Sequence, residues 1–179
     1  NAKVAYWKDT LYALAFRYWE QSHICSINIK TGETIPVSQY PTDNFELLNG
    51  KAYYACEYRE DGTMEEETRT ARHLYMHNLK TGREIYIGRV AYNWLIHEYY
   101  EPAENGVYYI DSITEELVFY NSKKQTHTTI NTGAKVTVLY RQNDYVIAHF
   151  AEGIEGTARL MVFDKTGAVY TSSDISDRA

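Results

Sequence analysis

Histidine and cysteine side chains could serve as metal ligands, bases or nucleophiles, but their spacing here matches none of the usual motifs. The six histidines are His23, His73, His77, His97, His127 and His149. None belongs to a His-x-His or His-Glu-x-x-His motif, and Cys25 and Cys56 form no Cys-x-x-Cys pair. The sequence also lacks a Gly-x-Ser-x-Gly elbow, a phosphate-binding loop and a dinucleotide motif. We therefore predict no catalytic residue, no metal site and no cofactor, in a protein that is not an enzyme.

Carboxylates are the more informative group, because they gather in four segments, at residues 19–23, 60–71, 111–116 and 151–158. These segments hold eleven of the chain's 24 acidic residues and one basic residue, Arg69. The eleven are Glu20, Glu60, Asp61, Glu65, Glu66, Glu67, Asp111, Glu115, Glu116, Glu152 and Glu155. The run of three glutamates lacks the Asp-x-Asp-x-Asp-Gly spacing of a calcium loop, so we expect no calcium site. If these segments meet on one surface of the folded protein, that surface is negatively charged. It then repels nucleic acid and attracts basic partners.

Two repeated turn sequences indicate the elements that position these segments. Asn28-Ile29-Lys30-Thr31-Gly32 recurs at 78–82, in degenerate form at 121–125 and shortened at 164–167, at intervals of about 40 to 50 residues. A second series of Asn-Gly or Asp/Asn turns, at residues 9–10, 49–50, 105–106 and 143–144, runs half a repeat out of phase. Asn, Asp and Gly close β-hairpins because they tolerate positive φ angles. Two interleaved turn series predict four strands per repeat.

A repeat of about 40 to 50 residues with four strands is typical of a β-propeller blade. We predict an all-β fold, a single propeller domain over residues 1–179, with four four-stranded blades at residues 3–38, 44–90, 93–131 and 134–172. Tyr, Val, Ile and Phe dominate the expected strands, and no helical periodicity is sustained. The 18 tyrosines are expected to pack between blades.

In such a propeller the four acidic segments join second to third strands, so they meet on one face. The predicted binding site on this face consists of Glu60, Asp61, Glu65, Glu66, Glu67, Glu115, Glu116, Glu152 and Glu155. We expect it to bind a protein or a basic peptide, with the long loop at 60–71 as a mobile contact. Charged loops that only keep the protein soluble are the alternative interpretation.

Two other groups of side chains have a defined place in this predicted fold. His73 and His77 share one face of a strand, about 13 Å apart, which is too far to bind one metal ion. His97 and Tyr99 lie in a predicted innermost strand over residues 93–100. We expect them to be candidates for lining the central channel.

The Tyr-rich second strands and the Lys-Thr-Gly turns resemble the blades of bacterial TolB-like, YWTD-like and quinoprotein-like propellers, over nearly the whole chain. This resemblance implies the blade architecture. Quinoprotein-like blades carry a Trp after the Thr-Gly turn, where this chain has Ile35, Tyr86 and Val169. The Tyr-Trp-Thr-Asp motif of the YWTD-like strands has only a partial match here, Tyr6-Trp7-Lys8-Asp9. No catalytic residue or cofactor is therefore taken from these families.

Alternatives remain open for both architecture and function. The blades form a complete small propeller, a fragment of a larger one, or an open arc that pairs with a second copy into a homodimer. A carbohydrate-active propeller enzyme or a sugar-binding module is the alternative function, since carboxylates from separate blades could converge about 5 to 10 Å apart. Convergent carboxylates with perturbed pKa values would favour hydrolysis, whereas a shallow acidic face would favour binding.

The composition and the first residues bear on the cellular compartment. No apolar stretch approaches the ~20 residues that span a bilayer, so we expect no membrane insertion of this segment. Asn1-Ala2 resembles the scar of a removed tag. We expect the extracytoplasmic part of an exported bacterial protein, secreted or anchored to a membrane through its N-terminus. The sequence does not show whether Cys25 and Cys56 are two free thiols, which we expect, or a disulfide, so the two cysteines do not indicate an oxidising or a reducing compartment.

Overall fold

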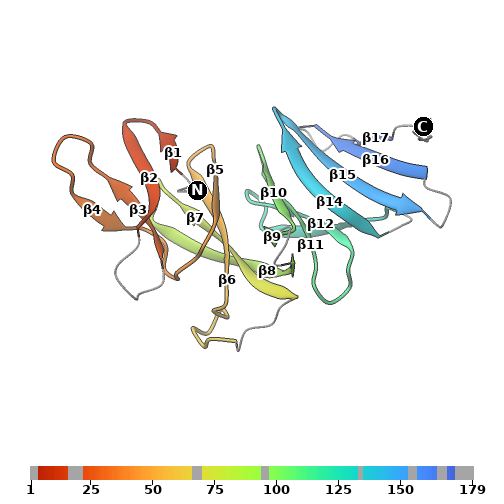
Figure 1. The fold of residues 1–179 in the computed structure, drawn as a ribbon, viewed down its shortest axis with the longest axis horizontal. Coiled ribbons are helices and arrows are strands. Elements are labelled where there is room, and N and C mark those ends of the chain that lie inside the picture. Colours follow the sequence, from red (N-terminus) through yellow and green to blue (C-terminus); the bar gives the residue numbers. More distant parts are fainter. Residues whose placement is uncertain are drawn as a thin grey trace. The chain divides into compact units, whose positions relative to one another are not determined.

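Strands make up all the regular secondary structure in the described residues (Figure 1). The computed structural model describes residues 4–15, 22–65, 70–93, 97–132, 135–152, 157–164 and 169–171. The strands are β1 (Val4–Trp7), β2 (Thr10–Ala15), β3 (His23–Ile27), β4 (Thr34–Pro36), β5 (Phe45–Leu48), β6 (Lys51–Cys56), β7 (Ala71–Asn78), β8 (Arg83–Asn93), β9 (His97–Glu98), β10 (Tyr100–Ala103), β11 (Gly106–Ile110), β12 (Leu117–Asn121), β13 (Thr126–Ile130), β14 (Val136–Gln142), β15 (Tyr145–Glu152), β16 (Thr157–Phe163) and β17 (Val169–Thr171). The prediction of an all-β fold is confirmed for these ranges.

These strands form four antiparallel sheets, and in each sheet every strand pairs with the next one along the chain. The orders are β1-β2-β3-β4, β5-β6-β7-β8-β9, β10-β11-β12-β13 and β14-β15-β16-β17. A four-stranded antiparallel meander is the topology of a propeller blade. The second sheet differs because a fifth strand, β9, is added at its edge. The fold is therefore propeller-like, with one sheet larger than predicted.

The repeated turn has the same hydrogen bonds in its three described copies. The Oδ1 atoms of Asn28, Asn78 and Asn121 accept hydrogen bonds from the N–H groups two and three residues later, at 2.9 to 3.3 Å. The last residue of the turn has a positive φ, 73° at Gly32 and 55° at Gln125. Glycine adopts this conformation without steric cost, and glutamine does not. The asparagine side chain thus preserves the turn where the glycine has been lost.

The chain folds into two compact units, Asn1–Thr68 with Arg72–Arg89, and Arg69–Ala71 with Val90–Ala179. In the first unit, the sheet β1–β4 and strands β5 to β8 share one core. Its buried members are Tyr12, Ile24, Tyr40, Phe45, Ala52, Tyr54, Cys56 and Tyr75. The first strands of the two sheets, β1 and β5, lie next to each other. Adjacent blades of a propeller are joined in this way.

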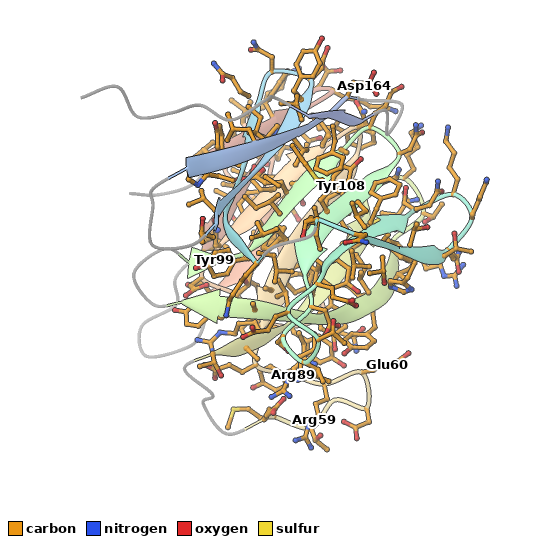
Figure 2. The ribbon with its side chains drawn as sticks, turned by 90° about the vertical axis from the view of Figure 1, so that its right-hand side faces the viewer. Arg59, Glu60, Arg89, Tyr99, Tyr108 and Asp164 are labelled. Carbon is orange, nitrogen blue, oxygen red and sulfur yellow. The ribbon has the colours of Figure 1, made fainter. Side chains whose placement is uncertain are left out.

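The second unit repeats this arrangement with β10–β13 and β14–β17. Its core consists of Tyr108, Ile110, Leu117, Val136, Leu139, Val146, Ala148 and Phe163. The first strands β10 and β14 lie side by side, as β1 and β5 do. The Tyr108 ring lies 4.6 Å from that of Phe119 and 4.7 Å from that of Phe163. Burial, with a smaller effect of the Asp164 charge, raises the pKa of Tyr108 to about 12 (Figure 2).

The chain between the second and third sheets differs from the predicted innermost strand over residues 93–100. Strand β8 continues to Asn93, and β9 pairs back with it, so that His97 faces Asn93 in the register. The first strand of the third sheet begins at Tyr100. The predicted strand is wrong because β8, with 11 residues, is long enough to pair with the returning chain at its end. The sequence pattern shows the apolar residues here but not the reversal.

Candidate binding site

The chain between β6 and β7 contains a small hairpin, residues 58–64, which we name the acidic hairpin. Its ends are joined by a β-bridge between Tyr58 and Met64. Gly62, with a φ of 81°, makes the turn possible. The Oδ1 atom of Asp61 accepts hydrogen bonds from the backbone N–H of Thr63 at 2.9 Å and from its hydroxyl at 2.6 Å. The turn therefore presents the exposed Glu60 and Asp61 at its tip.

A stack of tyrosines connects the acidic hairpin to the core of the first unit. The Tyr58 ring stacks on that of Tyr40, with centroids 5.2 Å apart and an interplanar angle of 9°. The Tyr75 hydroxyl donates a hydrogen bond to the Tyr58 carbonyl oxygen at 2.9 Å. Arg72 and Glu57 form an ion pair of 3.2 Å just before the hairpin. The described part of the loop that we expected to be a mobile contact is thus held by packing and by hydrogen bonds.

Glu65, immediately after the hairpin, is the centre of an ion-pair network. Its Oε2 atom is 2.6 Å from Nε2 of His73 on β7 and 3.8 Å from Nε of Arg59. Its Oε1 atom accepts a hydrogen bond of 2.6 Å from Arg89 on β8. Figure 2 shows Arg59, Glu60 and Arg89 grouped at this end of the unit. One carboxylate therefore joins the hairpin to two strands of the sheet.

The pKa of Glu65 lies below its ordinary value, which follows from these contacts. Burial opposes ionisation and by itself raises the pKa. The hydrogen bond from His73 and the positive charges of Arg89 and Arg59 outweigh burial, so the net shift is downward. Asp61 also has a lowered pKa, mainly because of its hydrogen bonds from Thr63. Both groups are carboxylates at neutral pH.

An open pocket of about 440 Å³ lies beside this network, in the first unit. It is lined by Arg59, Glu60, Asp61, His73 and Tyr86. The side chain of His73 is 8% exposed, whereas that of Arg59 is 52% exposed. The hydroxyl of Tyr86 lies 3.3 Å from Nδ1 of His73. The pocket therefore has two carboxylates on its hairpin side and a tyrosine–histidine pair on its sheet side.

A second histidine–carboxylate pair lies on the same face of the sheet. His77 Nδ1 is 2.5 Å from Oε2 of Glu84, whose Oε1 accepts a hydrogen bond from the Tyr54 hydroxyl. Burial, followed by the charge of Glu84, raises the pKa of Tyr54 far above its ordinary value. Tyr54 therefore remains a hydrogen-bond donor. His73 and His77 each have a carboxylate partner of their own, and this second pair lines no part of the pocket.

The other predicted site residues are less fully described. Glu66, Glu67 and Glu155 lie outside the described residues, and Glu152 is described only by its place in β15. Glu115 and Glu116 are exposed in the loop between β11 and β12, in the second unit. The Glu115 carboxylate accepts a hydrogen bond of 2.8 Å from Lys135. That all these carboxylates share one face therefore stays a prediction.

The channel candidates are His97 and Tyr99. The backbone of His97 belongs to β9, and its side chain lies outside the described residues. Tyr99 lies between β9 and β10 and packs, partly buried, against the core of the second unit. Its backbone N–H donates to the Ala91 carbonyl at 3.1 Å, and its carbonyl accepts from the Ile110 N–H at 3.0 Å. A role of these two residues in a channel stays a prediction.

Sequence reasoning missed Arg59, Arg89 and Tyr86 as members of the site, and it considered His73 only as a metal ligand, which it rejected. A usable signal was present in the alternation of residues along two neighbouring strands. His73 and His77 are four positions apart on β7, and Glu84 and Tyr86 are two positions apart on β8. Because alternate residues of a strand point to the same side, each pair shares a face of the sheet. The missing information was the fold of the hairpin that brings Glu65 onto that face.

Comparison with solved structures finds partial matches of low sequence identity. No family model and no curated protein matches the chain. A protein assigned as TolB from Agrobacterium tumefaciens aligns with 12% identity over 94% of this chain and 62% of its own, with a TM-score of 0.47. TolB from Acinetobacter baumannii aligns with 9% identity over 93% of this chain and 41% of its own, with a TM-score of 0.47.

A third structure is the S527A variant of the AtxE2 isopeptidase with astexin3-dC4 bound. It aligns with 13% identity over 89% of this chain and 25% of its own, with a TM-score of 0.45. The chain thus spans between a quarter and just under two thirds of the length of these proteins. In the described part of the chain, no helix is long and apolar enough to cross a membrane.

Proposed function

We propose that this chain is a recognition module that binds a basic segment of a protein partner at the acidic hairpin. The observation that carries this proposal is the charge distribution around the pocket. Glu60 and Asp61 line it, and neither is a partner in an ion pair between described residues. Of the neighbouring cations, Arg89 bonds to Glu65 at 2.6 Å, and Arg59 lies 3.8 Å from it. Two exposed carboxylates are thus available for a cation from a partner.

The anchoring of the hairpin supports recognition, because a prefolded site loses less conformational entropy on binding. The stack of Tyr58 on Tyr40 and the hydrogen bond from Tyr75 fix the base of the hairpin. The hydrogen bonds from Thr63 to Asp61 fix its tip. A basic side chain entering the pocket would also meet Tyr86, and aromatic rings attract cations at their faces.

The ionisation of Asp61 suits the attraction of a cation and does not suit the role of a general acid. A glycosidase of the usual kind needs one carboxylic acid with a raised pKa for that role. The pKa of Asp61, which lines the pocket, is lowered, and so is that of the neighbouring Glu65. Both groups are therefore negatively charged at neutral pH.

The architecture that we propose is a single propeller or propeller arc in which the four sheets are consecutive blades. It is supported by the neighbouring first strands in each unit, β1 with β5 and β10 with β14. In this arrangement the loop holding Glu115 and Glu116 would extend the acidic face. We further propose an extracytoplasmic location, as the sequence led us to expect, and fractionation of cells expressing the full reading frame tests it.

The binding proposal is tested by fluorescence anisotropy with a labelled oligolysine peptide and an oligoglutamate peptide of equal length. We expect binding of the oligolysine only, weakening from about 20 mM to about 150 mM salt because screening shortens the reach of the carboxylates. Glu60→Gln and Asp61→Asn should each weaken binding by about 1.5- to 5-fold, the usual range for exposed ion pairs. Asparagine at 61 keeps an oxygen for the Thr63 hydrogen bonds.

Glu33→Gln is the matched control, since it removes the same charge from an exposed position at another turn of the first unit. It should leave the affinity unchanged. Equal loss of binding in Glu33→Gln and Glu60→Gln would show that the net negative charge acts rather than the hairpin. Binding of oligolysine that is insensitive to salt would refute the electrostatic mechanism.

A further inference from the structure

Three side chains beside the pocket form a continuous hydroxyl–imidazole–carboxylate chain. The Tyr86 hydroxyl lies 3.3 Å from Nδ1 of His73, and Nε2 of the same ring lies 2.6 Å from Oε2 of Glu65. Tyr86 and His73 both line the pocket, whereas Glu65 is not among its lining residues. A nucleophile, a base and an orienting group occur in this order in hydrolases that use covalent catalysis.

The direction of the proton transfer follows from the ionisation of Glu65. An ionised carboxylate only accepts hydrogen bonds, so Nε2 of His73 must carry the proton that lies between them. In the neutral imidazole the other nitrogen, Nδ1, is then an acceptor. It faces the Tyr86 hydroxyl, which must be the donor. Glu65 thereby fixes the tautomer in which His73 can take a proton from Tyr86.

We propose that Tyr86 is an activated nucleophile in this pocket, with His73 as its general base, and that it takes an acyl group from carboxylic esters. The Tyr86 oxygen attacks the ester carbonyl carbon, and its proton passes to Nδ1 of His73. The bond from the carbonyl carbon to the leaving oxygen breaks. The leaving group departs with the proton from His73, or it departs as a free anion and His73 releases that proton to the solvent, so that His73 is neutral again in either case. The product is an acyl ester of Tyr86.

Water completes the reaction in the reverse sense. A water molecule attacks the acyl carbon, and His73 accepts its proton. The bond to the Tyr86 oxygen breaks, and that oxygen recovers the proton from His73. The free carboxylic acid leaves, so the net reaction is the addition of water across the ester.

The surroundings of the hydroxyl define the substrate. Arg59 lines the same pocket and is half exposed, so its guanidinium is available to a negative charge that develops on a carbonyl oxygen. Glu60 and Asp61 lie on the hairpin side. We therefore assign the site to esters that also carry a positive charge. The relay of Tyr86, His73 and Glu65 needs no bound protein segment, although the substrate charge assigned here rests on the same two carboxylates as the proposed function.

The test uses p-nitrophenyl acetate and the purified chain at pH 7.5. We expect a burst of p-nitrophenolate, an increase in intact mass of one acetyl group, and that group on Tyr86 in peptide mapping. Tyr86→Phe keeps the ring contacts with Tyr75 and His73 but should abolish the burst. Tyr6→Phe, at a tyrosine that is 60% exposed, is the control and should behave as the wild type.

Changes at the base test the relay itself. His73→Ala should lower the acylation rate of Tyr86 about 100-fold or more, the usual effect of losing a general base. Added imidazole should restore part of the rate in this variant and should have a much smaller effect on the wild type. An acetyl group found only on lysines or on Tyr6 would overturn the proposal. An unchanged burst in Tyr86→Phe, with the folded circular dichroism spectrum retained, would do the same.

Acylation and oligolysine binding, both measured on the wild type, separate the two proposals. Acylation of Tyr86 together with salt-sensitive peptide binding supports both proposals. Acylation of Tyr86 without peptide binding supports the relay and refutes the recognition role. Salt-sensitive peptide binding without acylation of Tyr86 supports the recognition role and overturns the relay.

Discussion

Replacing Glu65 by Gln should destabilise the first unit by about 2 kcal/mol. The change keeps the shape of the side chain but removes the charge that faces His73, Arg89 and Arg59. Hydrogen bonds to charged groups contribute about 1.5–3 kcal/mol each. Arg89 and Arg59 are 31% and 52% exposed and regain water, so most of the loss falls on the buried His73. One such bond, partly replaced by the glutamine oxygen, gives the value above.

The measurement is urea denaturation at pH 7, followed by tryptophan fluorescence and circular dichroism. In a thermal scan the same loss corresponds to a fall in Tm of roughly 4–8 °C for a chain of this size. Glu33→Gln is the matched control and should change the free energy of unfolding by less than about 0.5 kcal/mol. An effect of Glu65→Gln no larger than that of the control would refute the role of Glu65 as the centre of the network.

The pH dependence adds a second check with a defined sign. The pKa of Glu65 is lower in the folded protein than in the unfolded chain, where it is about 4.3. Its contribution is therefore complete above that value and is lost as the pH falls through the folded pKa. The difference in unfolding free energy between wild type and Glu65→Gln should shrink from pH 5 downward. A difference that stays constant or grows below that pH would contradict the assigned ionisation.

Three further predictions concern the turns and a buried thiol. Gly106→Ala should prevent normal folding or destabilise the protein by several kcal/mol, because an added Cβ would overlap the carbonyl group of Tyr120. Gly32→Ala has open space around it and should cost only about 1 kcal/mol, for the positive φ of that residue. Denaturation curves of the two variants test this difference. Gln125→Gly should stabilise the third turn by about 0.5 kcal/mol, since glutamine there has a φ of 55°; a decrease in Tm would contradict this. Burial raises the pKa of the Cys56 thiol to about 12. In the Cys25→Ala variant, Cys56 should therefore react slowly with Ellman's reagent at pH 8 and rapidly in urea. Fast reaction in the folded protein would refute the burial of this thiol.

The sheets could be predicted from the sequence because their turns are coded locally. Asn28, Asn78 and Asn121 each hold their own turn by accepting hydrogen bonds from the N–H groups two and three residues later, so a short motif is sufficient to locate it. The alternation of apolar residues then defines the strands between turns. Strand β9 could not be predicted in this way, because His97 and Glu98 depend on where the end of β8 lies in space.

The candidate site could be predicted only in part. Glu60 and Asp61 were found because charge in a loop is visible in the sequence. The network behind them was not found, because Glu65, His73 and Arg89 come from a loop and two strands and meet only when the hairpin folds back. Charge counting treated Glu65 as one more exposed carboxylate, although its side chain is 18% exposed and contacts three bases.

Pairing of each strand with its successor makes every sheet complete within one continuous stretch of sequence. The loops between paired strands are short, so the strands of one sheet can pair with each other before the rest of the chain has folded. Duplication or deletion of such a stretch adds or removes a whole hydrogen-bonded ladder and leaves the neighbouring ladders unbroken. A gene of this kind is therefore free to change length in steps of one sheet, as repeat proteins do.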